Sequence, residues 1–77
     1  MRLTLYFMDT CPYCRKVLNF MRQNNISIPM KSTFDPKNQQ ELIKIGGKSQ
    51  VPCLVIDGKA MYESDDIIAW LKVNWKK

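Results

Sequence analysis

Two cysteines separated by two residues stand where an apolar, β-prone run ends and helical spacing begins. Leu3 to Met8 has the composition of a buried strand. From about Cys11 to Asn24, apolar residues recur at the three- and four-residue spacing of one helix face. Cys11 and Cys14 therefore fall in the first turn of a helix that follows a strand. This placement is typical of a redox-active pair rather than of two unconnected structural cysteines.

The rest of the chain also divides into strand-like and helix-like segments. We expect a strand from Ile26 to Met30 and a helix from Asp35-Pro36 to Gly46-Gly47. Val51 to Ile56 and Lys59 to Tyr62 should form a hairpin around the turn Asp57-Gly58. A last helix should begin with Ser64 as its cap and carry the apolar stripe Ile67, Ile68, Leu71 and Trp75. A strand–helix–strand start implies a parallel pair, and the hairpin adds an antiparallel pair. The sequence therefore predicts one α/β domain over residues 1–77, ordered β-α-β-α-β-β-α, with a mixed four-stranded sheet flanked by helices.

Composition and charge exclude several classes of protein. The 77 residues are 45% hydrophobic and 25% charged, as in an ordinary globular chain. The start of the chain lacks the pattern of a signal peptide, and no apolar run could cross a bilayer, so we expect a cytoplasmic protein without membrane contact. The net charge of +5 is spread along the chain, and no nucleic-acid-binding motif is present. We interpret this charge as a solvated basic surface, with a mild attraction for an anionic substrate as the alternative.

The chemistry of the cysteine pair has to arise without histidine, which the chain does not contain. A helix start offers unpaired backbone N–H groups and the positive end of the helix dipole, and both favour thiolate over thiol. Arg15 and Lys16 add positive charge nearby. Cys11 is nearer the helix end and is the expected nucleophile. Cys14, one turn further in, is the expected resolving thiol.

Other roles for the cysteines are less well supported. A structural zinc site usually needs four nitrogen or sulfur ligands, and the chain offers three cysteines and no histidine, so we expect no metal. Cys53 lies in an apolar strand and is interpreted as an inert buried thiol. A third redox thiol is the alternative, because Cys53 follows Pro52 near the expected site.

The motif Cys11-Pro12-Tyr13-Cys14 and the predicted order of elements resemble the glutaredoxins and their thioredoxin-like fold over essentially the whole chain. The resemblance implies an enzyme without a bound cofactor that reduces glutathione mixed disulfides and protein disulfides and is recharged by glutathione. Tyr13 would flank the substrate.

Two further segments are similar to the glutathione-binding parts of that family. Gln50-Val51-Pro52 is similar to a segment whose proline is cis and whose valine backbone holds the cysteinyl part of glutathione. Ser64-Asp65 is similar to the position that binds the γ-glutamyl carboxylate and ammonium group. Free N–H groups at a helix start suit a carboxylate, and Asp65 suits the ammonium group.

The chain departs from the glutaredoxin pattern at two places. Met8 stands where the family usually carries a lysine near a glutathione carboxylate, and Tyr62-Glu63 replaces a Gly-Gly pair. Val51-Pro52 followed by Glu63-Ser64 is also similar to the amino-terminal domain of glutathione transferases, which holds glutathione as well. The helical second domain that those transferases require is not expected within these residues.

The expected partners are glutathione and disulfide-containing or glutathionylated proteins, and the chain is expected to be a monomer. Two alternatives remain open. One is a small redoxin that takes electrons from thioredoxin reductase and serves ribonucleotide reductase. The other is an iron–sulfur carrier bridged by glutathione, which Pro12 disfavours because cluster-binding relatives usually lack it.

Overall fold

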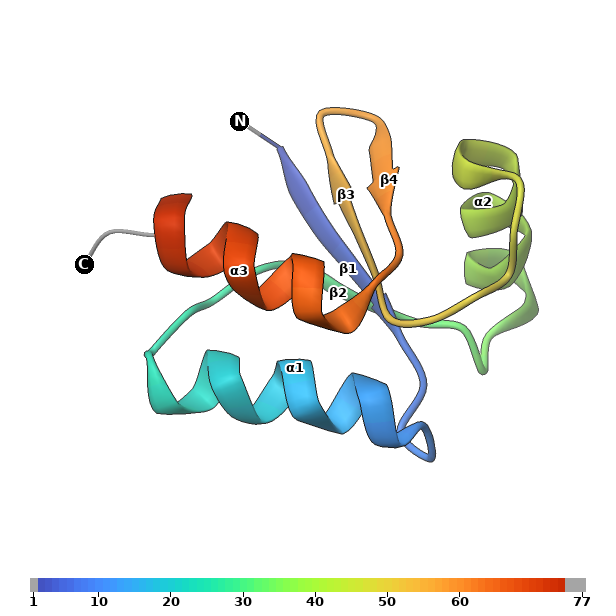
Figure 1. The fold of residues 1–77 in the computed structure, drawn as a ribbon. Coiled ribbons are helices and arrows are strands. Elements are labelled where there is room, and N and C mark those ends of the chain that lie inside the picture. The colour runs from blue at the N-terminus through green and yellow to red at the C-terminus, as the bar shows by residue number, and fades with distance from the viewer. Residues whose placement is uncertain (1, 75–77) are drawn as a thin grey trace.

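The computed structural model describes residues 2–74. Within this range the elements follow the predicted order β-α-β-α-β-β-α (Figure 1). They are β1 (Leu3–Phe7), α1 (Pro12–Gln23), β2 (Met30–Ser32), α2 (Pro36–Gly46), β3 (Cys53–Ile56), β4 (Lys59–Met61) and α3 (Ser64–Asn74).

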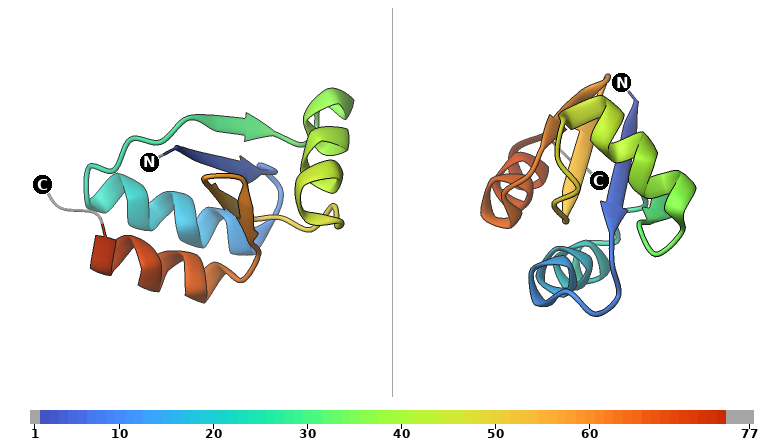
Figure 2. Two further views of the ribbon diagram at one scale, coloured as in Figure 1. Left: turned by 90° about the horizontal axis from the view of Figure 1, so that it is seen from above. Right: turned by 90° about the vertical axis from the view of Figure 1, so that its right-hand side faces the viewer.

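The four strands form one mixed sheet in the order β2-β1-β3-β4. β1 runs parallel to β2 and antiparallel to β3, and β3 pairs antiparallel with β4. α1 and α3 lie side by side on one face of the sheet, and α2 covers the other face (Figures 1 and 2). The predicted thioredoxin-like α/β fold is therefore confirmed.

Alternation along the strands divides the interior into two cores, because successive side chains of a strand point to opposite faces of a sheet. The core beneath α1 and α3 contains Leu5 and Leu54, whereas the core beneath α2 contains Tyr6 and Cys53. Each of these four residues is at most 1% exposed. The sheet is thus covered on both faces, and only its edges and ends are left for a site.

The second strand differs from the prediction. Ile26 and Ile28 are buried as their alternation indicates, but strand pairing begins only at Met30 and continues to Ser32. Residues 26–29 approach β1 without forming a ladder; one bond joins them, in which the amide of Leu5 donates to the carbonyl of Pro29 at 2.9 Å. Pro29 has no N–H to return. The strand therefore begins at Met30, the last residue of the expected strand from Ile26 to Met30.

Local signals set the ends of several other elements as expected. Pro12 and Pro36 occupy the start of α1 and α2, where the missing N–H costs nothing. The carboxylate of Asp35 accepts a hydrogen bond from the amide of Lys37 at 2.9 Å and so caps α2. Asp57 and Gly58 both have positive φ, the conformation that the tight β3–β4 turn requires.

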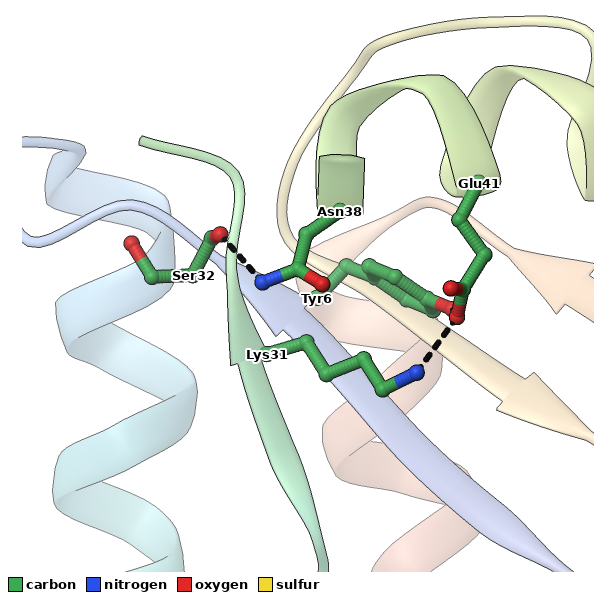
Figure 3. Close-up of polar contacts among 5 residues, drawn as sticks. All are labelled: Tyr6, Lys31, Ser32, Asn38 and Glu41. Carbon is green, nitrogen blue, oxygen red and sulfur yellow. Dashed lines mark hydrogen bonds and ion pairs between the residues drawn. The ribbon is translucent and has the colours of Figure 1, made fainter. Parts of the chain in front are cut away.

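A polar cluster fastens α2 to the sheet (Figure 3). The carboxylate of Glu41 accepts hydrogen bonds from the hydroxyl of Tyr6 and from the ammonium group of Lys31, the latter at 2.6 Å. The side-chain amide of Asn38 donates to the carbonyl of Ser32 at 2.9 Å. One helix is thereby tied to both β1 and β2.

The last helix is described as far as Asn74. Trp75, expected to extend the apolar stripe of the last helix, lies outside residues 2–74. Across those residues, none of the helices has the length and apolar content needed to cross a bilayer.

Candidate active site

Cys11 lies at the junction between β1 and α1, as its spacing predicts. It occupies the N-cap position of α1 with an extended backbone (φ −88°, ψ 120°). Its carbonyl accepts the first helical hydrogen bond, from the amide of Arg15 at 3.1 Å. Within the described residues its thiol makes no capping bond to the helix. The cap side chain therefore leaves the first N–H groups of α1 without a bond from the Cys11 sulfur, at the helix end where unpaired donors gather.

The two thiols of the motif differ in burial. Cys11 is partly exposed, whereas Cys14 is fully buried. Both are free thiols in the structure. Burial raises the pKa of Cys14 to about 12, and the amide of Met8, which donates to its sulfur at 3.4 Å, opposes that rise only in part. Cys14 therefore stays protonated at neutral pH, while Cys11 is the thiol that an incoming disulfide can reach.

A cavity of about 310 Å³ carries the other residues singled out from the sequence. Its lining comes from three separate segments of the chain: the start of α1, the segment before β3, and the start of α3. The lining residues are Tyr13, Gln50, Val51, Pro52, Tyr62, Glu63, Ser64 and Asp65. All six residues expected to contact glutathione thus meet around one cavity.

The segment before β3 connects this cavity to Cys11. The bond between Val51 and Pro52 is cis, as the resemblance implies. The thiol of Cys11 donates to the carbonyl of Val51 at 3.8 Å, within the range for a weak sulfur hydrogen bond. Val51 therefore contacts the Cys11 sulfur and also lines the cavity.

The start of α3 supplies the opposite wall, with one correction to the prediction. The carbonyl of Glu63 accepts the first helical bond, from the amide of Ile67 at 2.9 Å, so Glu63 is the capping residue and not Ser64. Ser64 is instead the first helical residue and is buried. The shift of one residue leaves the amides of Ser64 and Asp65 among the unpaired donors of the helix start.

Asp65 already has a partner in the structure. Its carboxylate forms an ion pair with the ammonium group of Lys16, which bridges α1 and α3 near the cavity. Both side chains are exposed, at 54% for Lys16 and 79% for Asp65, so water weakens the attraction. An ammonium group entering the cavity would share or replace this contact.

Three residues were missed or only partly recognised from the sequence. The sequence presents Tyr62 only as part of a departure from Gly-Gly, and Glu63 also as part of the transferase-like pair Glu63-Ser64, without a role for either; both line the cavity. Their position directly before Ser64 is the signal that could have found them. Lys16 was assigned to the environment of Cys11, but the structure shows it paired with Asp65.

Cys53, the third cysteine, is the first residue of β3. It is fully buried in the core beneath α2, together with Tyr6 and Leu42. Burial raises the pKa of its thiol to about 11, so the protonated form dominates at neutral pH. The expectation that Cys53 is buried is confirmed. Among residues 2–74, no three cysteine or carboxylate side chains are grouped so as to hold a metal ion.

Comparison with known proteins places this geometry in a family. Residues 5–74 match the family described as "Glutathione S-transferase, N-terminal domain". The chain belongs to this family. It spans 37% of a glutathione S-transferase from Bombyx mori, whose solved structure covers all of this chain with a TM-score of 0.83 at 24% sequence identity. That likeness shows the fold of a transferase amino-terminal domain, about a third of the transferase.

The chain also resembles proteins that it covers over most of their length. A glutaredoxin-like protein of Clostridium pasteurianum is 30% identical over 57 residues, which cover 73% of this chain and 76% of that protein. Glutaredoxin 3 of Escherichia coli is 28% identical over 66 residues, covering 84% of this chain and 80% of that protein. Both halves of the resemblance drawn from the sequence, to glutaredoxins and to glutathione transferases, are therefore confirmed.

Proposed function

We propose that this chain is a glutathione-dependent thiol–disulfide oxidoreductase that reduces glutathione mixed disulfides and protein disulfides. The observation that carries the proposal is the contact between the partly exposed Cys11 thiol and the Val51 carbonyl, at the rim of the cavity that Ser64 and Asp65 also line. The named glutaredoxin relatives support the redox chemistry, and the transferase family supports a glutathione site.

With a glutathione mixed disulfide, the Cys11 thiolate attacks the glutathione sulfur. A Cys11–glutathione disulfide forms, and the substrate leaves as a thiolate that takes up a proton. A second glutathione thiolate then attacks the glutathione sulfur of that adduct, which yields oxidised glutathione and restores the Cys11 thiolate. This cycle needs one protein thiol.

With a protein disulfide, the cycle uses both cysteines. Cys11 forms a mixed disulfide with the substrate. The Cys14 sulfur then attacks the Cys11 sulfur, the bond from Cys11 to the substrate sulfur breaks, and the Cys14 proton passes to the leaving substrate thiolate. The substrate leaves in its reduced form, and a Cys11–Cys14 disulfide remains. Two glutathione molecules then reduce it. The burial of Cys14 suits this role, because a fully buried thiol is closed to a disulfide from solution, whereas the Cys11 side chain lies in hydrogen-bonding contact with it.

A thioredoxin-reductase-linked redoxin is a second candidate. It is favoured by Met8, which carries no charge where a lysine would meet glutathione, and by the Lys16–Asp65 ion pair, which a glutathione ammonium group would have to disturb.

The choice of reductant tests the proposal. The oxidised protein is supplied with NADPH and either glutathione plus glutathione reductase or thioredoxin reductase, and NADPH consumption is followed with a cysteinyl–glutathione mixed disulfide as substrate. We expect saturable turnover with the glutathione system and little with thioredoxin reductase. Rapid reduction by thioredoxin reductase, without turnover by glutathione, would replace the proposal with the second candidate.

A further inference from the structure

Tyr62 meets the end of α2 at unusually close range. A Cβ placed on Gly46 would come within 1.8 Å of the Tyr62 hydroxyl oxygen and 2.9 Å of the Ala60 Cβ. No real side chain tolerates the first of these distances against a fixed ring. Gly46 therefore leaves the space into which the ring end of Tyr62 fits, and the two residues together seat α2 against the end of β4.

The Tyr62 hydroxyl also contacts the segment that follows α2. It donates to the carbonyl of Lys48 at 3.2 Å. The Lys48 ammonium group lies 5.2 Å from the centre of the Tyr62 ring, within the range of a cation–π contact. Lys48, two residues beyond the end of α2, is thus held at its backbone and at its side chain by one aromatic residue.

This segment, residues 47–52, joins α2 to β3 and ends at the candidate site (Figure 1). Gln50, Val51 and Pro52 line the cavity, and the carbonyl of Val51 accepts from Cys11. Tyr62 lines the same cavity from the opposite segment. Tyr62 therefore contacts the segment near its beginning, at Lys48, and lines the cavity together with the end of the segment.

We propose that Tyr62 is a positioning residue that fixes residues 47–52 through Lys48 and thereby sets the width of the cavity and the placement of the Val51 carbonyl beside Cys11. The inference rests on the proposed function for its substrate. The sequence presents Tyr62 only as part of the replaced Gly-Gly pair, so the role would be one that this chain gains at that departure. Glutathione mixed disulfides should depend on it more than small disulfides that do not fill the cavity.

Two variants perturb the contact differently. Tyr62→Phe keeps the ring and the cation–π contact but removes the hydroxyl that donates to Lys48. Gly46→Ala keeps the hydroxyl but forces the ring to move. Tyr6→Phe is the matched control, since it removes a different tyrosine hydroxyl bond, to Glu41, on the α2 face of the sheet.

The readouts are KM and kcat for a cysteinyl–glutathione mixed disulfide, the second-order rate constant for cystamine, and amide hydrogen exchange of residues 48–51. Loss of one neutral hydrogen bond should raise KM about three- to fivefold in Tyr62→Phe, with kcat and the cystamine rate nearly unchanged. Gly46→Ala should raise KM at least as much, and both variants should show faster exchange in residues 48–51. Tyr6→Phe should lower stability without altering KM.

Three outcomes would overturn the inference: unchanged KM in both variants, equal losses with both substrates, or exchange of residues 48–51 that stays as slow as in the unaltered protein. Failure of the proposed function has a separate signature. The unaltered protein would then show no turnover of the mixed disulfide at all, and the exchange measurement alone would decide whether Tyr62 fixes the segment.

Discussion

At the scale of single residues, side chains of the same type differ in their surroundings at the candidate site. Cys11 and Cys14 have the same side chain, yet one lies partly exposed at the cap of α1 and the other is fully buried one turn later. Asp65 and Asp66 are also neighbours, and only Asp65 lines the cavity and pairs with Lys16. Such pairs allow each role to be tested against a chemically matched residue.

Asp65 should contribute measurably but modestly to glutathione use. Exposed ion pairs are worth about 0.2–1 kcal/mol, so Asp65→Ala should raise KM for glutathione by a factor of about 1.4 to 5. Met8→Lys should lower KM, because it restores a positive charge for a glutathione carboxylate. Steady-state kinetics with glutathione as the varied substrate measure both effects.

Asp66→Ala is the control, since it removes the same charge from the same turn of α3 outside the cavity. If Asp65→Ala and Asp66→Ala changed KM equally, the effect would come from net charge, and Asp65 would have no specific role.

At the scale of elements, contacts between distant segments decide what the sequence cannot. The place of Cys11 and Cys14 at the start of α1, the helix starts at Pro12 and Pro36 and the turn at Asp57-Gly58 could be predicted, because each is a signal within a few neighbouring residues. The start of β2 could not, because it depends on which amides of β1 face Pro29. The Tyr62–Lys48 and Lys16–Asp65 contacts likewise join residues that are 14 and 49 positions apart.

The cluster that ties α2 to the sheet should make stability depend on pH. Lys31 and Tyr6 hold the pKa of Glu41 below its ordinary value of 4.5. A lowered carboxyl pKa contributes stability that is present above 4.5 and is lost as pH falls through the folded-state pKa. The unaltered protein should therefore exceed Glu41→Gln in stability at pH 7, and this difference should shrink as pH falls below 4.5.

Urea unfolding at a series of pH values measures this difference. Lys31→Met should make the stability difference between the protein with Glu41 and the Glu41→Gln variant depend less on pH, because Lys31 is the main cause of the lowered pKa of Glu41. Lys37→Met removes the same charge from an exposed position of α2 and should leave the pH dependence in place. Parallel stability curves for the unaltered protein and Glu41→Gln would contradict the role assigned to Glu41.

At the scale of the whole molecule, the topology brings the site together from three parts of the chain. β1 is a central strand of the sheet, and the chain passes from its end through Cys11 into α1. The segment before β3 and the start of α3 then close the cavity around it. Helix starts carry positive partial charge, so the arrangement suits both a thiolate and an anionic ligand.

The central claim is that Cys11 alone begins the exchange, with glutathione as the partner. The most direct measurement is intact-mass analysis of Cys11→Ser and Cys14→Ser after incubation with oxidised glutathione, paired with turnover of a glutathione mixed disulfide and a protein disulfide. Cys14→Ser should carry a single glutathione on Cys11, retain mixed-disulfide turnover and lose most protein-disulfide reduction, while Cys11→Ser should carry no adduct and show neither activity. Equal adduct formation or equal loss of both activities in the two variants would contradict the account.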